Sequence, residues 1–249
     1  MIFVTGDTHG DFRRFGKKSF PEQSNLCSDD YVIVCGDFGL LGLTRTKEEE
    51  YWRKWLEERP FTICFVCGNH ENYDRLFSDE FPVDEWAGGR VRFLGRNIIY
   101  LGRGQVFDIS GNRIFTFGGA ASHDLEGEVL SRSDPNYAIK KKRLLKANKF
   151  FRTEHEDWWK EELPTQEEME DGMLNLKKVG NKVDYIITHC AASDTQKNFE
   201  GYPETPLNAY FESLKKTVDY RHWYFGHYHE NRGLNNKETI LYEKIVPIL

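Results

Sequence analysis

One junction recurs four times in the sequence: a short apolar segment, then glycine, then a side chain able to bind a metal ion. The four glycine-containing junctions are Phe3-Val4-Thr5-Gly6-Asp7, Ile33-Val34-Cys35-Gly36-Asp37, Phe65-Val66-Cys67-Gly68-Asn69 and Trp223-Tyr224-Phe225-Gly226-His227. A fifth segment, Ile186-Ile187-Thr188-His189, ends in histidine without the glycine. Short apolar, β-branched runs are typical of buried strands, and ligands of open α/β sheets bind at the carboxyl ends of the strands. The sequence therefore predicts an α/β fold in which five strand ends meet at one site.

Further apolar runs and helical patterns fill the intervals between these junctions. A tight turn at 109–112 predicts a hairpin, and a capping-box pattern at Thr46–Glu49 predicts a helix that ends near Arg59. Alternating strands and helices with added hairpins favour an α/β sheet with antiparallel additions. The predicted strands are Ile2–Thr5, Tyr31–Cys35, Phe61–Cys67, Asn97–Leu101, Gln105–Ile109, Arg113–Phe117, Val183–Thr188, His222–Phe225 and Glu238–Glu243.

A charged segment at about 137–172 interrupts this pattern. Its first half is basic and its second half acidic, and its apolar content is too low for a core of its own. We therefore expect one domain over residues 1–249 that carries a helical insertion. Two interpretations of the basic half stay open: a solvated helix paired with the acidic stretch that follows it, or a rim in which Lys140 and Arg143 bind substrate.

Seven side chains at the strand ends are candidate metal ligands: Asp7, His9, Asp37, Asn69, His189, His227 and His229. Carboxylate, imidazole and amide donors without thiolate suit a catalytic site for manganese, iron or zinc, not a structural zinc site. Seven donors exceed the need of one ion, whereas two ions that share a carboxylate would use them all. Two divalent ions, two aspartates and a bridging hydroxide leave a charge near +1, which would attract a phosphate ester.

The motifs Gly6-Asp7-Thr8-His9-Gly10, Gly36-Asp37, Gly68-Asn69-His70-Glu71, Thr188-His189 and Gly226-His227-Tyr228-His229 resemble the ordered motif set of calcineurin-like metallophosphoesterases. The resemblance implies a four-layer α/β/β/α sandwich of two mixed sheets with a dinuclear site. It implies that Asp7, His9, Asp37 and His229 bind one ion, and that Asp37, Asn69, His189 and His227 bind the other, with Asp37 as the bridge. It also implies that His70 binds the phosphate and protonates the leaving group.

Two departures separate this chain from familiar branches of that family. Serine/threonine phosphatases carry Asp and Arg three and four residues after the bridging aspartate, where this chain has Leu40 and Leu41. Purple acid phosphatases carry tyrosine at the position of Leu40. The chain is more similar to a bacterial and phage-type group of the family, for which the resemblance implies no substrate.

The predicted activity is hydrolysis of a phosphomonoester or phosphodiester by a metal-bridging hydroxide, with Asn69, His123 and Asp124 as further candidate substrate contacts. The expected cofactors are two divalent ions, manganese first, with iron, zinc, cobalt or nickel as alternatives. Two other functions stay open: a nuclease acting on DNA or RNA ends, and a catalytically silent module that binds metal and phosphate.

Composition limits the partners and the compartment. A net charge of −6 argues against a protein that coats nucleic acid, so nucleic acid is expected only as a substrate. No stretch approaches the ~18 apolar residues of a membrane helix, and the N-terminus lacks a signal-peptide pattern. Five cysteines are too sparse for a disulfide framework. We therefore expect a cytoplasmic protein without a membrane partner, and its oligomeric state stays open.

Overall fold

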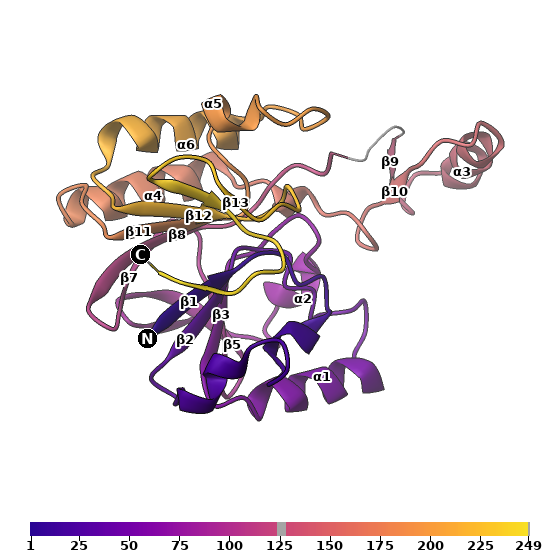
Figure 1. The fold of residues 1–249 in the computed structure, drawn as a ribbon. Helices are drawn as coiled ribbons and strands as arrows, with labels where there is room; N and C mark the ends of the chain where they lie inside the picture. Colours follow the sequence, from indigo (N-terminus) through magenta and orange to yellow (C-terminus); the bar gives the residue numbers. More distant parts are fainter. Residues whose placement is uncertain (124–127, 249) are drawn as a thin grey trace.

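Two mixed β-sheets stack face to face in the computed structural model, which describes residues 1–123 and 128–248 (Figure 1). The first sheet has the order β15-β1-β2-β3-β6-β5-β4. Its central strands β1, β2, β3 and β6 are parallel. Strand β15 pairs antiparallel with β1 at one edge, and at the other side β5 pairs antiparallel with β6 and the edge strand β4 pairs antiparallel with β5. The strands are β1 (Ile2–Thr5), β2 (Tyr31–Val34), β3 (Thr62–Phe65), β4 (Asp84–Trp86), β5 (Gly89–Gly95), β6 (Ile98–Leu101) and β15 (Val246–Pro247).

The second sheet repeats this plan with the order β13-β14-β12-β11-β8-β7. Strands β8, β11, β12 and β14 are parallel, and β7 and β13 are antiparallel at the two edges. The strands are β7 (Gln105–Ile109), β8 (Asn112–Phe117), β11 (Tyr185–Thr188), β12 (His222–Phe225), β13 (Arg232–Gly233) and β14 (Glu238–Ile240). The parallel strands of both sheets therefore present their carboxyl ends to the site described below.

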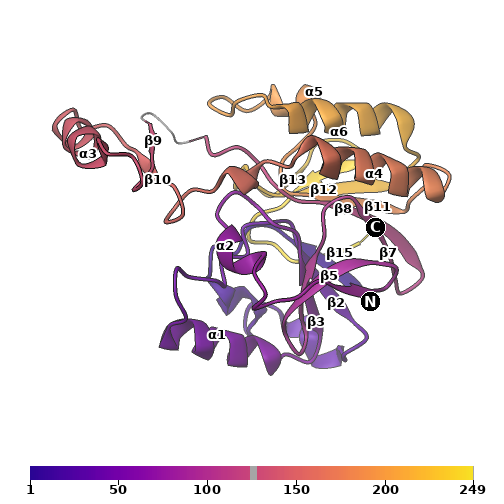
Figure 2. The same ribbon diagram turned by 180° about the vertical axis from the view of Figure 1, so that it is seen from behind.

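Three apolar layers hold four structural layers together. One layer lies between the sheets and includes Val4, Ile33 and Ile187. A second packs the outer face of the first sheet against the N-terminal 3₁₀ helices and α1, and a third packs the second sheet against α4 and α6 (Figure 2). The helices are α1 (Lys47–Glu57), α2 (Tyr73–Leu76), α3 (Tyr137–Lys146), α4 (Gln166–Lys178), α5 (Ser193–Gln196) and α6 (Pro206–Thr217), with 3₁₀ turns η1 (Phe12–Phe15), η2 (Pro21–Asn25) and η3 (Lys160–Glu162). This arrangement is the α/β/β/α sandwich that the sequence predicts.

The predicted secondary structure is confirmed at each apolar run, all of which contain or overlap a strand. The predicted hairpin joins β7 and β8, where Ser110 and Gly111 have φ of 50° and 76°. The hydroxyl of Thr46 caps α1 by accepting a hydrogen bond from the backbone N–H of Glu49. The predictions do not include β4 and β5, because arginines alternate with apolar residues along β5 and a bulge at Phe93–Gly95 breaks its period.

The charged segment differs from the expected insertion at both ends. A short ribbon of β9 (Val129–Leu130) and β10 (Arg152–Thr153) carries α3, and this unit projects from the two-sheet body (Figures 1 and 2). Helix α4 instead packs on the second sheet through Met169 and Leu176. The acidic residues at the start of α4 thus cover the body of the protein and do not belong to the projecting unit. Among the described residues, no helix has the length and apolar character needed to cross a bilayer.

Candidate metal centre

Five loops bring the candidate ligands to one edge of the sandwich. Asp7 and His9 follow β1, Asp37 follows β2, Asn69 follows β3, His189 follows β11, and His227 and His229 follow β12. The first three loops belong to one sheet and the last two to the other. The site therefore lies where the carboxyl ends of both parallel strand sets face each other.

Four of these ligand residues have left-handed backbone conformations. The φ angles are 46° at His9, 48° at Asp37, 71° at His227 and 50° at His229. Side chains other than glycine adopt this region at a cost, and such strained residues cluster at functional sites. Each sharp turn lets the chain leave its strand and direct a polar side chain across the end of the sheet.

Two of the junction glycines are required by close approach of the ligand carboxylates. A Cβ atom at Gly68 would lie 2.0 Å from Oδ1 of Asp37, and one at Gly226 would lie 2.1 Å from Oδ1 of Asp7. A real side chain at either position would displace the carboxylate. These two glycines thus make room for ligands delivered by other strands, by the adjacent β2 at Gly68 and by β1 of the opposite sheet at Gly226.

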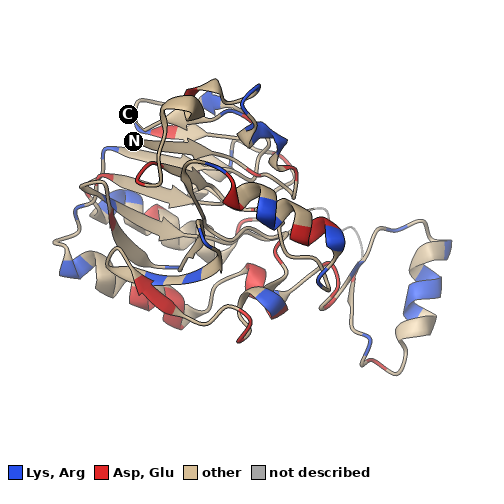
Figure 3. Cartoon of the chain, turned by 90° about the horizontal axis from the view of Figure 1, so that it is seen from below, with Lys and Arg blue, Asp and Glu red and all other residues tan. Residues whose placement is uncertain are grey.

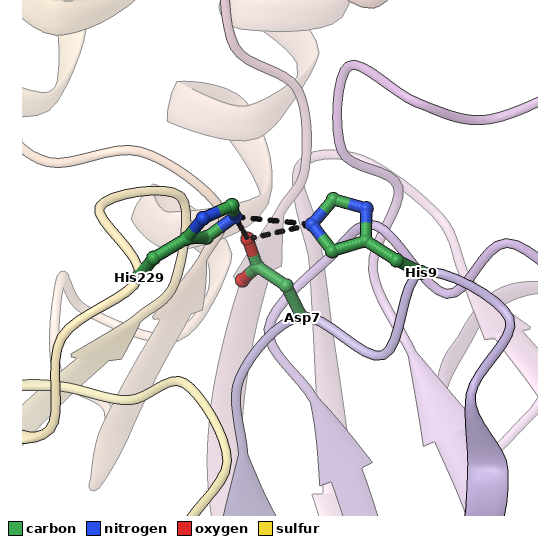
Figure 4. A group of neighbouring side chains, drawn as sticks. All are labelled: Asp7, His9 and His229. Atoms are coloured by element: carbon green, nitrogen blue, oxygen red, sulfur yellow. Dashed lines mark hydrogen bonds and ion pairs between the residues drawn. The ribbon is translucent and has the colours of Figure 1, made fainter.

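The first ligand group contains Asp7, His9 and His229 (Figure 4). Oδ2 of Asp7 lies 3.3 Å from Nε2 of His229 and 3.8 Å from Nε2 of His9. The two imidazole nitrogens lie 3.0 Å apart. Three donor atoms therefore converge at separations that one metal ion would bridge.

The second ligand group contains Asp7, Asp37 and His189. The ring N–H at Nδ1 of His189 donates a hydrogen bond of 2.7 Å to the carbonyl oxygen of Cys35. A backbone acceptor of this kind fixes the tautomer and orientation of a metal-binding histidine. Nε2 of His189 then faces Oδ2 of Asp37 at 3.4 Å and Oδ1 of Asn69 at 3.2 Å.

Asp37 lies between the two groups. Its Oδ2 is 3.8 Å from Nε2 of His9 and 3.4 Å from Nε2 of His189. Asp7 also reaches both groups, since its Oδ1 lies 3.9 Å from Nδ1 of His189. Both buried carboxylates thus stand between the imidazoles of the two sheets.

His227 contributes differently. Its backbone N–H donates hydrogen bonds of 3.0 and 3.2 Å to the two carboxylate oxygens of Asp7. Its ring centre lies 4.9 Å from that of His189, yet its side chain belongs to neither of the two tight groups among the described residues. In this geometry the clearest contact of His227 orients Asp7.

The charges of the site are strongly coupled. Burial alone would raise the pKa of Asp37, but the neighbouring His189 holds that pKa well below its usual range. Burial would lower the pKa of His189, but Asp37 and Asp7 raise it to about 10. Burial lowers the pKa of His9. Burial and the charge of His189 together lower the pKa of His227. Divalent cations bound at these carboxylates would oppose protonation of His189, so metal binding should release a proton.

The donor set fits divalent ions such as manganese, iron or zinc. It combines buried carboxylates, one amide oxygen and imidazoles, with no thiolate among the donors. The described cysteines are free, and four of the five are buried.

Comparison with known proteins identifies the family. A sequence model of the calcineurin-like phosphoesterases matches residues 1–231. The chain belongs to the calcineurin-like phosphoesterase family. A comparison with curated proteins gives no match.

His70, which the family resemblance assigns to the leaving group, adjoins this site. Its ring centre lies 5.4 Å from that of His9, and its backbone N–H donates a hydrogen bond of 2.8 Å to Oδ1 of Asp37. Leu40 and Leu41, which stand where protein phosphatases of the family carry Asp and Arg, are buried in the apolar layer outside the first sheet. Asp37 thus holds the main chain of His70, and this chain lacks the Asp and Arg side chains that protein phosphatases carry at these two positions.

The candidate substrate residues divide into two sets. The ring of His123 lies beside the metal centre, with its centre 5.5 Å from that of His227 and 4.3 Å from that of Tyr202. Asp124 lies outside the described residues. Lys140 and Arg143 lie on α3, the basic helix that stands apart from the body in Figure 3, and pair with Asp134 at 2.6 Å and Glu128 at 2.5 Å. Asp134 and Glu128 both precede α3. Lys140 and Arg143 therefore do not form these ion pairs with the acidic stretch that follows the helix.

Three further residues support the ligands, and of these only Glu71 belongs to one of the sequence motifs. Arg14 donates hydrogen bonds to the carbonyl oxygens of Asp7 (2.6 Å) and Tyr242. The ring of Tyr242 stacks on that of His229, with centres 4.5 Å apart and planes at 22°. Glu71 is buried and accepts hydrogen bonds from the backbone N–H groups of Phe38 (2.7 Å) and Gly39 (3.3 Å). The sequence offers a signal for Glu71 alone, because it directly follows His70. No spacing rule points to Arg14 or Tyr242.

Proposed function

We propose that this phosphoesterase hydrolyses a phosphate ester at a centre of two divalent ions bridged by Asp37. The observation that carries the proposal is the position of Oδ2 of Asp37 between Nε2 of His9 and Nε2 of His189. Asp7, His9 and His229 would hold one ion together with Asp37. Asn69 and His189 would hold the other, with His227 beside them. When bound, two such ions polarise the phosphoryl group and activate water for in-line displacement.

The residues of the chain have separate tasks in this proposal. Asp37 fixes the spacing of the two ion sites, since a single oxygen faces donors from both sheets. Asn69 would contribute the neutral amide oxygen of the second site. His70 would bind the phosphoryl group and donate a proton to the departing alcohol, because its imidazole lies next to the first ligand group without belonging to it. A positioned general acid of this kind contributes ~10²–10⁴-fold to a rate.

Reconstitution with defined metals tests the proposal. The metal-free protein would be loaded with Mn²⁺, Fe²⁺, Zn²⁺, Co²⁺ or Ni²⁺ and assayed with nitrophenyl phosphate, its bis-ester, cyclic nucleotides and a phosphopeptide. We expect turnover that needs two ions per chain and is greatest with Mn²⁺. Two bound ions without turnover of any ester would support the silent binding module instead.

A further inference from the structure

A cavity of about 300 Å³ opens beside His70. His70 belongs to its wall and also contacts the ligand His9 through its ring. The candidate ligands of the metal centre do not line this cavity in the described part of the chain. It is therefore a separate space that adjoins the catalytic centre at one residue.

Hydrogen bonds fix the wall of this cavity in place. One side is the loop at Leu41–Leu43 after β2, whose Gly42 carbonyl oxygen accepts a 2.8 Å hydrogen bond from Nδ2 of Asn72. The other side is the base of the projecting unit. Asp74 on α2 accepts hydrogen bonds from Nε1 of Trp159 at 2.8 Å and Nδ1 of His155 at 3.0 Å, which ties that base to the His70 loop. The projecting unit thus completes a preformed cavity and does not hang free over the site.

The lining combines charged hydrogen-bonding groups with apolar faces. Arg152, Glu156 and Asp157 supply a guanidinium and two carboxylates. Leu41, Leu43 and Trp159 supply the apolar part. Such a mixture suits a ligand that carries hydroxyl groups and C–H faces together. It does not suit a purely apolar group, which would leave the charged side chains without water.

We propose that this cavity is the leaving-group subsite and that it accepts a compact, hydroxyl-rich alcohol such as a sugar or polyol. This inference rests on the proposed function, because the alcohol oxygen must lie within hydrogen-bond reach of His70 to receive its proton. The rest of the alcohol then extends into the space next to His70. The volume falls at the small end of the ~300–1,000 Å³ of ligand pockets, which fits one sugar-sized group and not a polymer segment.

The experiment compares two esters with similar alkyl leaving groups, a hexose 6-phosphate and methyl phosphate, on metal-loaded protein. The ratio of their kcat/KM values measures what the cavity contributes. We expect the wild type to favour the hexose ester at least tenfold. Leu43 lines the cavity and its side chain is 55% exposed. Leu43→Trp should fill part of the cavity with the larger indole ring and lower the ratio toward one. The matched control is Leu145→Trp, at a 62% exposed residue of α3 away from the cavity, which should keep the wild-type ratio.

A second variant guards against misfolding of the first. Glu156→Gln keeps the shape of the lining but removes the charge of an acceptor that also pairs with Arg132, and it should lower the ratio roughly tenfold, as expected for a lost hydrogen bond to a charged group. Equal kcat/KM for the two esters in the wild type, or ratios unchanged in both variants, would overturn the subsite while the phosphoesterase stands. No turnover of either ester or of nitrophenyl phosphate would instead contradict the proposed function itself.

Discussion

The backbone N–H of His70 donates a 2.8 Å hydrogen bond to Oδ1 of Asp37, so one carboxylate contacts both the candidate general acid and the ligand cluster. Oδ2 of the same carboxylate faces the imidazoles of His9 and His189. An ester bound at the proposed ion positions would therefore lie at a fixed place relative to the main chain of His70. This link makes the position of His70 depend on its backbone, so its side chain can be removed without disturbing the ligands.

Replacement of His70 by alanine should lower kcat and leave both ions bound. Loss of a general acid costs ~10²–10⁴-fold, and the loss should be smaller for nitrophenyl phosphate, whose leaving group needs little protonation. Steady-state kinetics with nitrophenyl and alkyl esters, together with metal analysis of the variant, checks this. Equal losses for both esters would contradict the acid role of His70.

Replacement of Gly226 by alanine should displace Asp7. The new Cβ atom would lie 2.1 Å from Oδ1 of Asp7 and 2.9 Å from the carbonyl oxygen of Cys35. We expect a loss of ~1–3 kcal/mol in the free energy of unfolding, as for other overpacked sites, and weaker metal binding. Gly233→Ala is the matched control, because a Cβ atom there meets nothing within 4 Å. Similar metal affinity and unfolding midpoints for the two variants would refute the close-approach argument.

Tyr242 should act as a positioning residue for the first ion. Its ring stacks on His229, and its carbonyl oxygen accepts a hydrogen bond from Arg14, which also holds Asp7. Tyr242→Leu should weaken the binding of one ion roughly 10–100-fold, as do losses of other groups that orient metal ligands. Tyr242→Phe keeps the ring and should restore wild-type affinity. A calorimetric metal titration decides this, and a phenylalanine variant as weak as the leucine variant would show that stacking is not the cause.

The basic helix α3 should have little influence on catalysis. Its described ion pairs involve exposed side chains, and such pairs contribute ~0–1 kcal/mol each. We expect the quadruple variant Lys140→Ser, Lys141→Ser, Lys142→Ser and Arg143→Ser to keep the KM of both nitrophenyl phosphate and a short oligonucleotide. A rise in KM for the oligonucleotide alone, larger at low salt, would restore the nuclease alternative.

The sequence predicts the strands well because buried strands depend on local rules, and it places the candidate ligands directly after them. Strands β1, β2, β3, β11 and β12 are buried on both faces, so they form apolar runs that stand out without an alignment. The candidate ligands follow these runs directly, and Gly68 and Gly226 mark two places where a ligand from another strand approaches closely. His70 lies next to Asn69 in the loop after β3, so the same strand end places both residues.

Other features depend on contacts between distant segments and could not be predicted in this way. Helix α4 begins with acidic residues that resemble the charged segment before it, while a few apolar side chains, Met169, Met173 and Leu176, pack it on the sheet. The stack of Tyr242 on His229 joins two loops on either side of β13 and β14. The wall contributed by Arg152 and Trp159 arises from the tether of Asp74 to the projecting unit, which no motif indicates.

Asp37→Asn should disrupt both ion sites, because its Oδ2 faces donors of each. Metal analysis of the purified variant should find fewer than two ions per chain. Asp11→Asn is the control, since Asp11 is an exposed cap of η1 that accepts a hydrogen bond from Arg13 and belongs to neither ligand group. Retention of two ions at wild-type affinity in Asp37→Asn would remove the bridging assignment.

A dinuclear centre bridged by Asp37 can be tested by the electron paramagnetic resonance spectrum of the protein reconstituted with two equivalents of Mn²⁺. Ions bridged by one carboxylate at ~3.5–4 Å are close enough for magnetic coupling. We expect the multiline spectrum of an exchange-coupled pair, which disappears in Asp37→Asn and persists in Asp11→Asn. The six-line spectrum of isolated Mn²⁺ in the wild type at two bound equivalents would contradict a dinuclear centre bridged by Asp37.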